Sequence, residues 1–392
     1  TLQHAADNVS AGDTVIVEPG TYVGFNMQGK SGTATERIVF SAQDNVIIND
    51  DNPAGYSDDG IYLYDCDYVT IEGFEIQGGN GVDIARDGIR VVGTASDAVD
   101  GVILRDNTIN ACDDRGILTG YADDILIENN EVSNSVKEHG IYVSNSGDNP
   151  IVRGNTTWGN NACGIQLNAD AGAGGDGIIS NALIENNTIY DNGDSGGAAI
   201  NLDGVQDSII QNNLLYDNHH TGIALWKGDG ATGCINNDIV NNTIVNASDS
   251  RWALSIVGGS TDNTVFNNIL YTERTSVVGS FVISADSLSG LASDYNIVMD
   301  KFSEDNEGSI ISLSSWQSST GQDTNSFIAI PSELFSNSAL DDYSLFEGSL
   351  AINEGISTFN SASAPETDIE GTSRSAVDIG AFEFPVAIPE PS

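Results

Sequence analysis

A short strand pattern recurs along most of this chain, and it restricts the possible folds more than any other feature of the sequence. A glycine or alanine is followed by an isoleucine or leucine, a variable residue and, in most copies, a second aliphatic residue. The pattern is found at residues 60–63, 88–91, 116–119, 140–143, 164–167, 199–202, 222–225 and 253–256. A second recurring element ends in an asparagine, at Asn107, Asn130, Asn155, Asn187, Asn213, Asn242 and Asn268, with intervals of 23 to 32 residues.

A repeat of this length, built from short strands, indicates one coil of a solenoid per repeat. Apolar and polar residues alternate within each strand, so one face of the strand points inward. Residues 60–270 lack helical periodicity, a dense leucine pattern and the strand spacing of a propeller. The sequence therefore predicts an all-β fold, a right-handed parallel β-helix with three sheets. Stacking the coils would place each asparagine above the last, so that the amides satisfy one another and the backbone at a tight corner.

The two ends of the chain depart from the repeat. Residues 11–50 read as an opening coil, and the pattern blurs after about residue 290, where Ser, Asp and Asn increase. We predict a β-helix over residues 1–295, C-terminal coils and a cap over residues 296–385, and a tail over residues 386–392. A cap is expected because an open end would expose unpaired strand edges.

The charge excludes one class of partner. The chain has 57 Asp and Glu against 13 Lys and Arg, a formal net charge of −44. Binding to nucleic acid needs a basic surface, so we expect none. Plain solvation, a saline environment and Ca²⁺ bound in acidic loops all remain compatible with this charge. We expect Ca²⁺ as the one possible cofactor, no organic cofactor, no membrane span and a monomer.

The four cysteines are far apart in the sequence and form no CxxC pair. This spacing disfavours zinc and favours buried, unpaired thiols in the coil stack over disulfides. The cysteines are Cys66, Cys112, Cys163 and Cys234.

Two segments carry resemblances to known families. Residues 11–49, with Ser31-Gly32-Thr33-Ala34, are similar to the first coil of the alginate lyase and chondroitinase B type of polysaccharide lyase. The central coils resemble β-helix proteins that bind or hydrolyse carbohydrate. The lyase Arg-His-Gly element is absent, as are the polygalacturonase signature and the Asp-Pro-His motif of mannuronan epimerases, so no catalytic set transfers intact. The end of the chain, Ile388–Ser392, resembles the beginning of a PEP-CTERM sorting signal, which implies a bacterial protein that is secreted or held at the cell surface.

The outward residues of the repeated strand should form two columns across the coils. One column is Tyr62, Arg90, Leu118, Tyr142, Gln166, Asn201, Ala224 and Ser255, and the next is Tyr64, Val92, Gly120, Ser144, Asn168, Asp203, Trp226 and Val257. Aromatic faces stack on sugar rings and amides read hydroxyl groups, so these columns predict a sugar-binding groove. The alternative to a groove is a solvent-exposed sheet face that binds no ligand.

Basic residues are scarce, yet Arg90, Arg115, Lys137 and Lys227 fall on the predicted groove side, and the turns add His139, His219 and His220. In β-elimination a cation neutralises a uronate carboxylate and a base removes the C5 proton. We predict Arg90 or Arg115 as the neutralising cation, Lys137 or His139 as the base and Tyr142 as the donor to the leaving oxygen. The remaining predicted substrate-binding residues are Glu138, Gln166, Asn201, Asp203, Trp226 and Lys227.

Two alternatives stay open beside a polysaccharide lyase. A glycoside hydrolase would use two carboxylates about 5–10 Å apart, drawn from Asp113, Asp114, Glu138 and Asp203. Coils about 4.8 Å apart allow that separation. A non-catalytic, polysaccharide-binding or adhesive surface protein is the third possibility, because long solenoids also serve as spacers.

Overall fold

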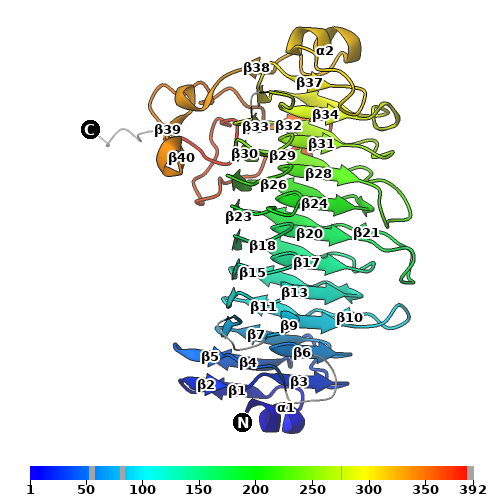
Figure 1. Cartoon of the computed structure of the whole chain (residues 1–392), viewed down its shortest axis with the longest axis vertical. Coiled ribbons are helices and arrows are strands. Elements are labelled where there is room, and N and C mark those ends of the chain that lie inside the picture. The colour runs from blue at the N-terminus through cyan, green and yellow to red at the C-terminus, as the bar shows by residue number, and fades with distance from the viewer. Residues whose placement is uncertain (53–57, 80–83, 275, 386–392) are drawn as a thin grey trace.

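The protein is a long stack of coils in which each turn adds one strand to each of three parallel sheets (Figure 1). The computed structural model describes residues 1–52, 58–79, 84–274 and 276–385. The stack is a right-handed parallel β-helix of about 11 turns, which confirms the predicted fold class. Sheets A and C have eleven strands each and sheet B has twelve.

Sheet A contains β1 (Thr14–Val17), β4 (Ile38–Ala42), β7 (Val69–Glu72), β11 (Ile103–Arg105), β15 (Leu126–Glu128), β18 (Ile151–Arg153), β22 (Leu183–Glu185), β26 (Ile209–Gln211), β29 (Asp238–Val240), β32 (Thr264–Phe266) and β35 (Ala292–Asp294). Sheet B contains β2 (Gly20–Tyr22), β5 (Val46–Ile48), β8 (Glu75–Gln77), β12 (Thr108–Asn110), β16 (Glu131–Ser133), β19 (Thr156–Trp158), β23 (Thr188–Tyr190), β27 (Leu214–Tyr216), β30 (Thr243–Asn246), β33 (Ile269–Thr272), β36 (Ile297–Val298) and β38 (Phe327–Ile328). Sheet C contains β3 (Phe25–Gln28), β6 (Ile61–Tyr64), β9 (Asp87–Val92), β13 (Arg115–Gly120), β17 (Ile141–Ser144), β20 (Ile165–Asn168), β24 (Ile200–Asp203), β28 (Ile223–Trp226), β31 (Leu254–Ile256), β34 (Phe281–Ile283) and β37 (Phe302–Ser303).

The repeated Gly-Ile strand is the strand of sheet C. In β17 the side chains of Ile141 and Val143 are fully buried, whereas that of Tyr142 points outward. Ile141 pairs in register with Ile117 on one side and Ile165 on the other, so like residues stack through the core. Burial of such a column removes apolar surface from water at every coil, and this burial is the main term that holds the solenoid together.

The predicted asparagine ladder is present at the corner between sheets A and B. The Nδ2 of Asn187 donates to Asn213 Oδ1 at 2.9 Å and to the Val152 carbonyl oxygen at 2.9 Å. Its own Oδ1 accepts from the backbone N–H and the Nδ2 of Asn155. The same bonds repeat from Asn107 to Asn268, and the ladder continues to Asn296.

Short helices lie at the two ends of the stack. Helix α1 (Leu2–Asn8) buries Leu2 and Ala6 in the core at the N-terminal end. Helix α2 (Leu313–Thr320) covers the other end, where Trp316 stacks on Phe302 with ring centroids 5.2 Å apart. These two are the α-helices of the part of the chain that the structure describes.

The C-terminal region contains further coils and a segment that folds back on the solenoid. Strands β36, β37 and β38 continue the coils beyond residue 295, and α2 closes the stack. Residues 331–385 do not cover the last coil; they fold back along the side of the solenoid beside β26–β33 (Figure 1). There Tyr343, from β40 (Asp342–Leu345), packs on Tyr216, and the Asn241 side chain donates to two carbonyl oxygens of residues 378–380. The predicted tail, residues 386–392, lies outside the described residues.

All four cysteines are unpaired and buried, as the sequence predicted. Burial raises the pKa of Cys66 to about 11 and that of Cys163 to about 12, so the thiols stay protonated. No helix within the described residues is long and apolar enough to cross a membrane.

Candidate functional site

The two predicted columns lie in register on the outer face of sheet C. Tyr142 pairs with Gln166, and Gln166 pairs with Asn201. In the second column Asn168 pairs with Asp203, and Asp203 pairs with Trp226. Each column therefore runs along the solenoid axis and takes one side chain from each coil, at a spacing of about 4.8 Å.

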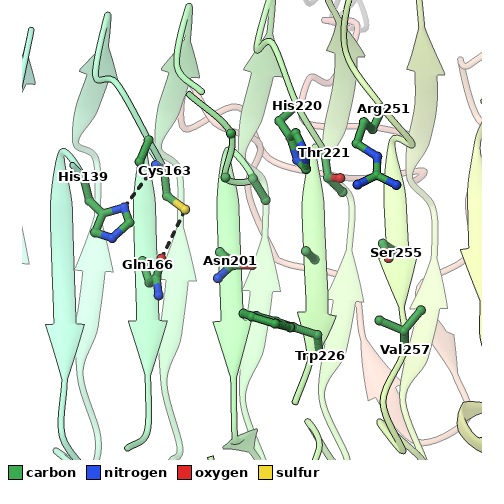
Figure 2. A pocket seen from close by; sticks show the side chains of 15 residues that line it. His139, Cys163, Gln166, Asn201, His220, Thr221, Trp226, Arg251, Ser255 and Val257 are labelled. Carbon is green, nitrogen blue, oxygen red and sulfur yellow. Dashed lines mark hydrogen bonds between the residues drawn. The ribbon is translucent and has the colours of Figure 1, made fainter. Parts of the chain in front are cut away.

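A cavity of about 420 Å³ opens on this face, over β17, β20, β24, β28 and β31 (Figure 2). Its lining combines residues of both columns with residues of the turns that enter sheet C. The lining residues are His139, Ala162, Cys163, Gln166, Gly196, Gly197, Ala198, Asn201, His220, Thr221, Ala224, Trp226, Arg251, Ser255 and Val257. A concave site with a few polar groups and an aromatic residue is what a small ligand requires.

Four of the predicted site residues line this cavity: His139, Gln166, Asn201 and Trp226. The Trp226 side chain is 39% exposed. In Figure 2 its indole extends from β28 toward the strand that carries Asn201. The structure thus brings together an aromatic platform and two amides.

His139 is held in one orientation at the edge of the cavity. Its Nδ1 accepts a hydrogen bond from the backbone N–H of Cys163 at 3.1 Å. Burial, and then the nearby positive charge of Arg115, lowers the pKa of His139 to about 4. The neutral ring therefore carries its proton on Nε2. This arrangement favours His139 as a hydrogen-bond donor over its predicted role as a base.

Arg115 lies beside the cavity but is already surrounded by carboxylates. Its Nε contacts Asp87 at 2.7 Å, and one Nη contacts Glu138 at 2.8 Å. The other Nη lies 3.6 Å from Asp114. Its side chain is 12% exposed, so a substrate carboxylate would have to displace these partners. Arg115 and Glu138 form a structural ion pair between coils and do not line the cavity.

Tyr142 and Lys137 also lie outside the cavity lining. The Tyr142 hydroxyl accepts from Asn168 Nδ2 at 3.0 Å, and burial raises the pKa of the phenol. Lys137 is bound to Asp114 at 3.0 Å and to Asp113 at 3.4 Å. Hydrogen bonds to these two aspartates raise the pKa of Lys137, which keeps it protonated and disfavours it as the predicted base.

The remaining three predicted residues support the scaffold. Asp203 is fully buried, and its carboxylate accepts from the backbone N–H groups of residues 228, 229 and 230 at 2.7–3.1 Å. Lys227 donates to the Ala231 carbonyl oxygen. Arg90 packs over the Tyr62 ring at 5.5 Å, well down the solenoid. The structure therefore does not bring Asp203, Lys227 or Arg90 to the cavity.

Two chemically important lining residues were not among the predicted catalytic or substrate-binding residues, although the sequence pattern placed one of them, His220, on the groove side. His220 and Arg251 come from neighbouring turns that enter β28 and β31, and Figure 2 shows them at the same end of the cavity. Burial, and then the charge of Arg251, lowers the pKa of His220. Arg251 contacts Glu307 at 2.5 Å, with its side chain 42% exposed. The cavity thus holds a neutral imidazole beside a partly exposed guanidinium that has one carboxylate partner.

Comparisons with known proteins agree on the fold. A family model described as periplasmic copper-binding protein (NosD) matches residues 6–196, and a model described as right handed beta helix region matches residues 169–287. A search of curated proteins gave no match.

Solved structures with similar folds include three polysaccharide lyases. Pectate lyase Pel9A is 17% identical, with a TM-score of 0.59 over 98% of this chain and 90% of its own. An alginate lyase from Paenibacillus sp. str. FPU-7 is 19% identical, with a TM-score of 0.52 over 71% and 94%. A rhamnogalacturonan lyase is 18% identical, with a TM-score of 0.50 over 72% and 79%. The chain is a right-handed parallel β-helix protein, and at these identities the likeness establishes the fold alone.

The described residues do not fit a copper centre such as the first family description names. Within them, no group of three or more His, Cys, Asp or Glu side chains is placed to hold a metal ion. The thiols that could bind copper are buried and separate. The expected Ca²⁺ remains a prediction.

Proposed function

We propose that this protein binds a uronate-containing polysaccharide along sheet C and cleaves it by β-elimination. The observation that carries the proposal is the cavity in which His220 and Arg251 lie together, on the same face as Trp226, Gln166 and Asn201. The polysaccharide lyases among the structures of similar fold support this choice of substrate class.

His220 and Arg251 would divide the chemistry. One Nη of Arg251 is paired with Glu307, and the remaining N–H groups of its guanidinium would pair with the sugar carboxylate and stabilise the charge that develops when the C5 proton leaves. The neutral His220 ring would take that proton, because its lowered pKa keeps it unprotonated near neutral pH. The C5–H electrons form the C4=C5 double bond, the C4–O bond breaks, and the proton passes from His220 to the leaving oxygen.

The other lining residues would bind neighbouring sugars. His139 lies on the turn before β17, three strands from β28, which is about 14 Å at the usual strand spacing. It is therefore too far from His220 to act on the same ring, and its Nε2–H would donate to a hydroxyl or carboxylate of another sugar. Trp226 would stack on a ring face between these positions, while Gln166 and Asn201 would read hydroxyl groups.

Hydrolysis is less well supported by the geometry. The cavity lining, as far as the structure describes it, contains no Asp or Glu. Glu138 is paired with Arg115, and Asp203 is buried under its turn. A binding protein without activity would use the same cavity, and product formation distinguishes a lyase from such a protein.

The test is incubation of the purified protein with polygalacturonate, alginate and two neutral polysaccharides. Ultraviolet absorbance of unsaturated products and new reducing ends are followed together, with His220→Ala as the matched control. A rise of both signals on a uronate, lost in the variant, is expected. New reducing ends without absorbance would replace the lyase by a hydrolase, and binding without either signal would make it a binding protein.

We also propose that the protein acts outside the cytoplasm. The first matching family is described as periplasmic, and polymeric uronates are met outside the cell. The acidic composition suits an exposed, highly solvated protein.

A further inference from the structure

His219, next to the proposed base, does not line the cavity but connects three turns that do. Its Nε2 lies 3.0 Å from Asp191, and its Nδ1 lies 3.0 Å from Asp249. Asp194 is a third carboxylate, 3.7 Å from Nε2. The two ring nitrogens thus contact carboxylates of different coils, so the imidazole ring bridges the two coils.

Each bridged turn continues directly into the cavity wall. The turn of Asp191 and Asp194 leads to Gly196, Gly197 and Ala198, and that of Asp249 leads to Arg251. His219 itself precedes His220. The first of these turns includes Gly193, Gly196 and Gly197, all at positive φ, so its backbone has few side chains of its own to hold it. A side-chain bridge is therefore well placed to fix the wall.

The bridge needs a proton. A neutral imidazole has one N–H and one lone pair, so it can donate to Asp191 or to Asp249 but not to both. In the neutral form one nitrogen lone pair would face a carboxylate oxygen about 3 Å away, which is repulsive. Only the imidazolium satisfies both contacts.

We propose that protonated His219 is a positioning residue that holds the turns of the cavity wall together and so keeps the Arg251 and His220 ends of the site aligned. The proposal rests on the proposed function only for the identity of the ligand. Loss of the proton releases one carboxylate, and the glycine-rich turn then moves away from its neighbours.

The surrounding charges favour the protonated ring. Besides the three aspartates, Asp217 faces it from its own turn, and Glu273 and Asp341 lie near Asp217. Arg274 opposes this field while donating to the carbonyl oxygens of residues 249 and 250. Burial alone would lower the pKa of His219, but hydrogen bonds to Asp191 and Asp249 outweigh it and raise the pKa above 6.5. The bridge is therefore complete below pH 6.5 and is lost as pH rises through the raised pKa.

The first test needs no ligand. Amide hydrogen exchange of peptides covering residues 191–198 and 249–252 is compared between about pH 5.5 and about pH 8.5, after correction for intrinsic rates. We expect protection in the wild-type protein to fall about threefold or more at the higher pH, with little change in β11 and β12. His219→Gln should show the lower protection at both pH values, and His4→Gln, at an exposed position of α1, should behave as wild type.

A second variant guards against a folding defect. Asp249→Asn removes one carboxylate, so a neutral ring can satisfy what remains and the pH step should shrink. Histidine ring resonances should place the wild-type His219 titration above 6.5 and that of the variant lower. Equal pH steps in wild type and His219→Gln, or a wild-type titration at or below 6.5, would overturn the proposal.

Ligand binding then separates this proposal from the proposed function. Affinity for a uronate oligosaccharide should weaken with rising pH in wild type and show a flat profile in His219→Gln. If no sugar binds at any pH, the proposed function fails, while the hydrogen-exchange result still tests whether protonated His219 holds the turns together. If sugar binds with equal pH dependence in both proteins, the His219 bridge does not position the site, and the proposal is wrong.

Discussion

At the level of single residues, His220 is the side chain on which we expect activity to depend most. Its neutral ring lies in the cavity, and no hydrogen bond engages the ring nitrogens among the described residues, so they are available to a substrate. His220→Ala should lower kcat/KM about 10²-fold or more, the usual contribution of a positioned base. Steady-state kinetics on the best uronate polymer checks this, with His4→Ala as the matched control. Activity near the wild-type value in a folded variant would move the reactive centre elsewhere.

His139 gives a prediction about stability rather than activity. Its pKa falls from 6.5 to about 4 on folding, so the unfolded chain binds more protons between these values. The native state therefore loses stability as pH falls from 6.5 toward 4, by up to about 3 kcal/mol from this residue. His139→Gln should lack this part of the acid sensitivity in denaturant titrations at a series of pH values. The same slope in both proteins would contradict the burial assigned to the ring.

The residue scale also explains which site predictions the sequence could support. Gln166, Asn201 and Trp226 were found because strand alternation and the coil register determine which side chains share a face. Arg115 and Lys137 were misleading because their carboxylate partners come from other coils or turns, and sequence spacing cannot show that those charges are already paired. In the sequence these residues form one list of bases, whereas only the contacts show how many carboxylates each cation already holds, three for Arg115 and one for Arg251.

At the level of elements, the asparagine ladder is the feature most open to a direct test. Asn187 is fully buried and bonds to both neighbouring coils. Asn187→Ala would leave the buried backbone N–H of Asn155 without its acceptor and would remove the side-chain bonds to Asn213 and Val152, so the free energy of unfolding should fall by about 3 kcal/mol or more. Chemical denaturation measures this, with Asn8→Ala, an exposed position at the end of α1, as the control. A loss equal to that of the control would mean that water replaces the amide fully.

Elements differ in how far the sequence determined them. The coils were predictable because each must repeat the same inward aliphatic pattern and the same corner asparagine. The region after residue 295 was not, because it has no repeat of its own. Its position depends on surface side chains of earlier coils, such as Tyr216 against Tyr343. Arg251 was not predicted, and His220 was placed only on the groove side, because both residues lie in turns whose lengths vary from coil to coil.

At the level of the whole molecule, the charge of −44 should make stability depend on salt. Unfolding moves the carboxylates apart, so their repulsion opposes the folded state, and screening within about 3–10 Å relieves it. Tm should therefore rise with sodium chloride. Calcium and magnesium chloride at equal ionic strength test the expected Ca²⁺, because screening alone would raise Tm equally with both salts. Thermal unfolding across both series checks this. A Tm that does not change with sodium chloride would show that the carboxylates are too far apart in the native state to repel one another, whereas a larger effect of calcium than of magnesium would reveal a specific Ca²⁺ site.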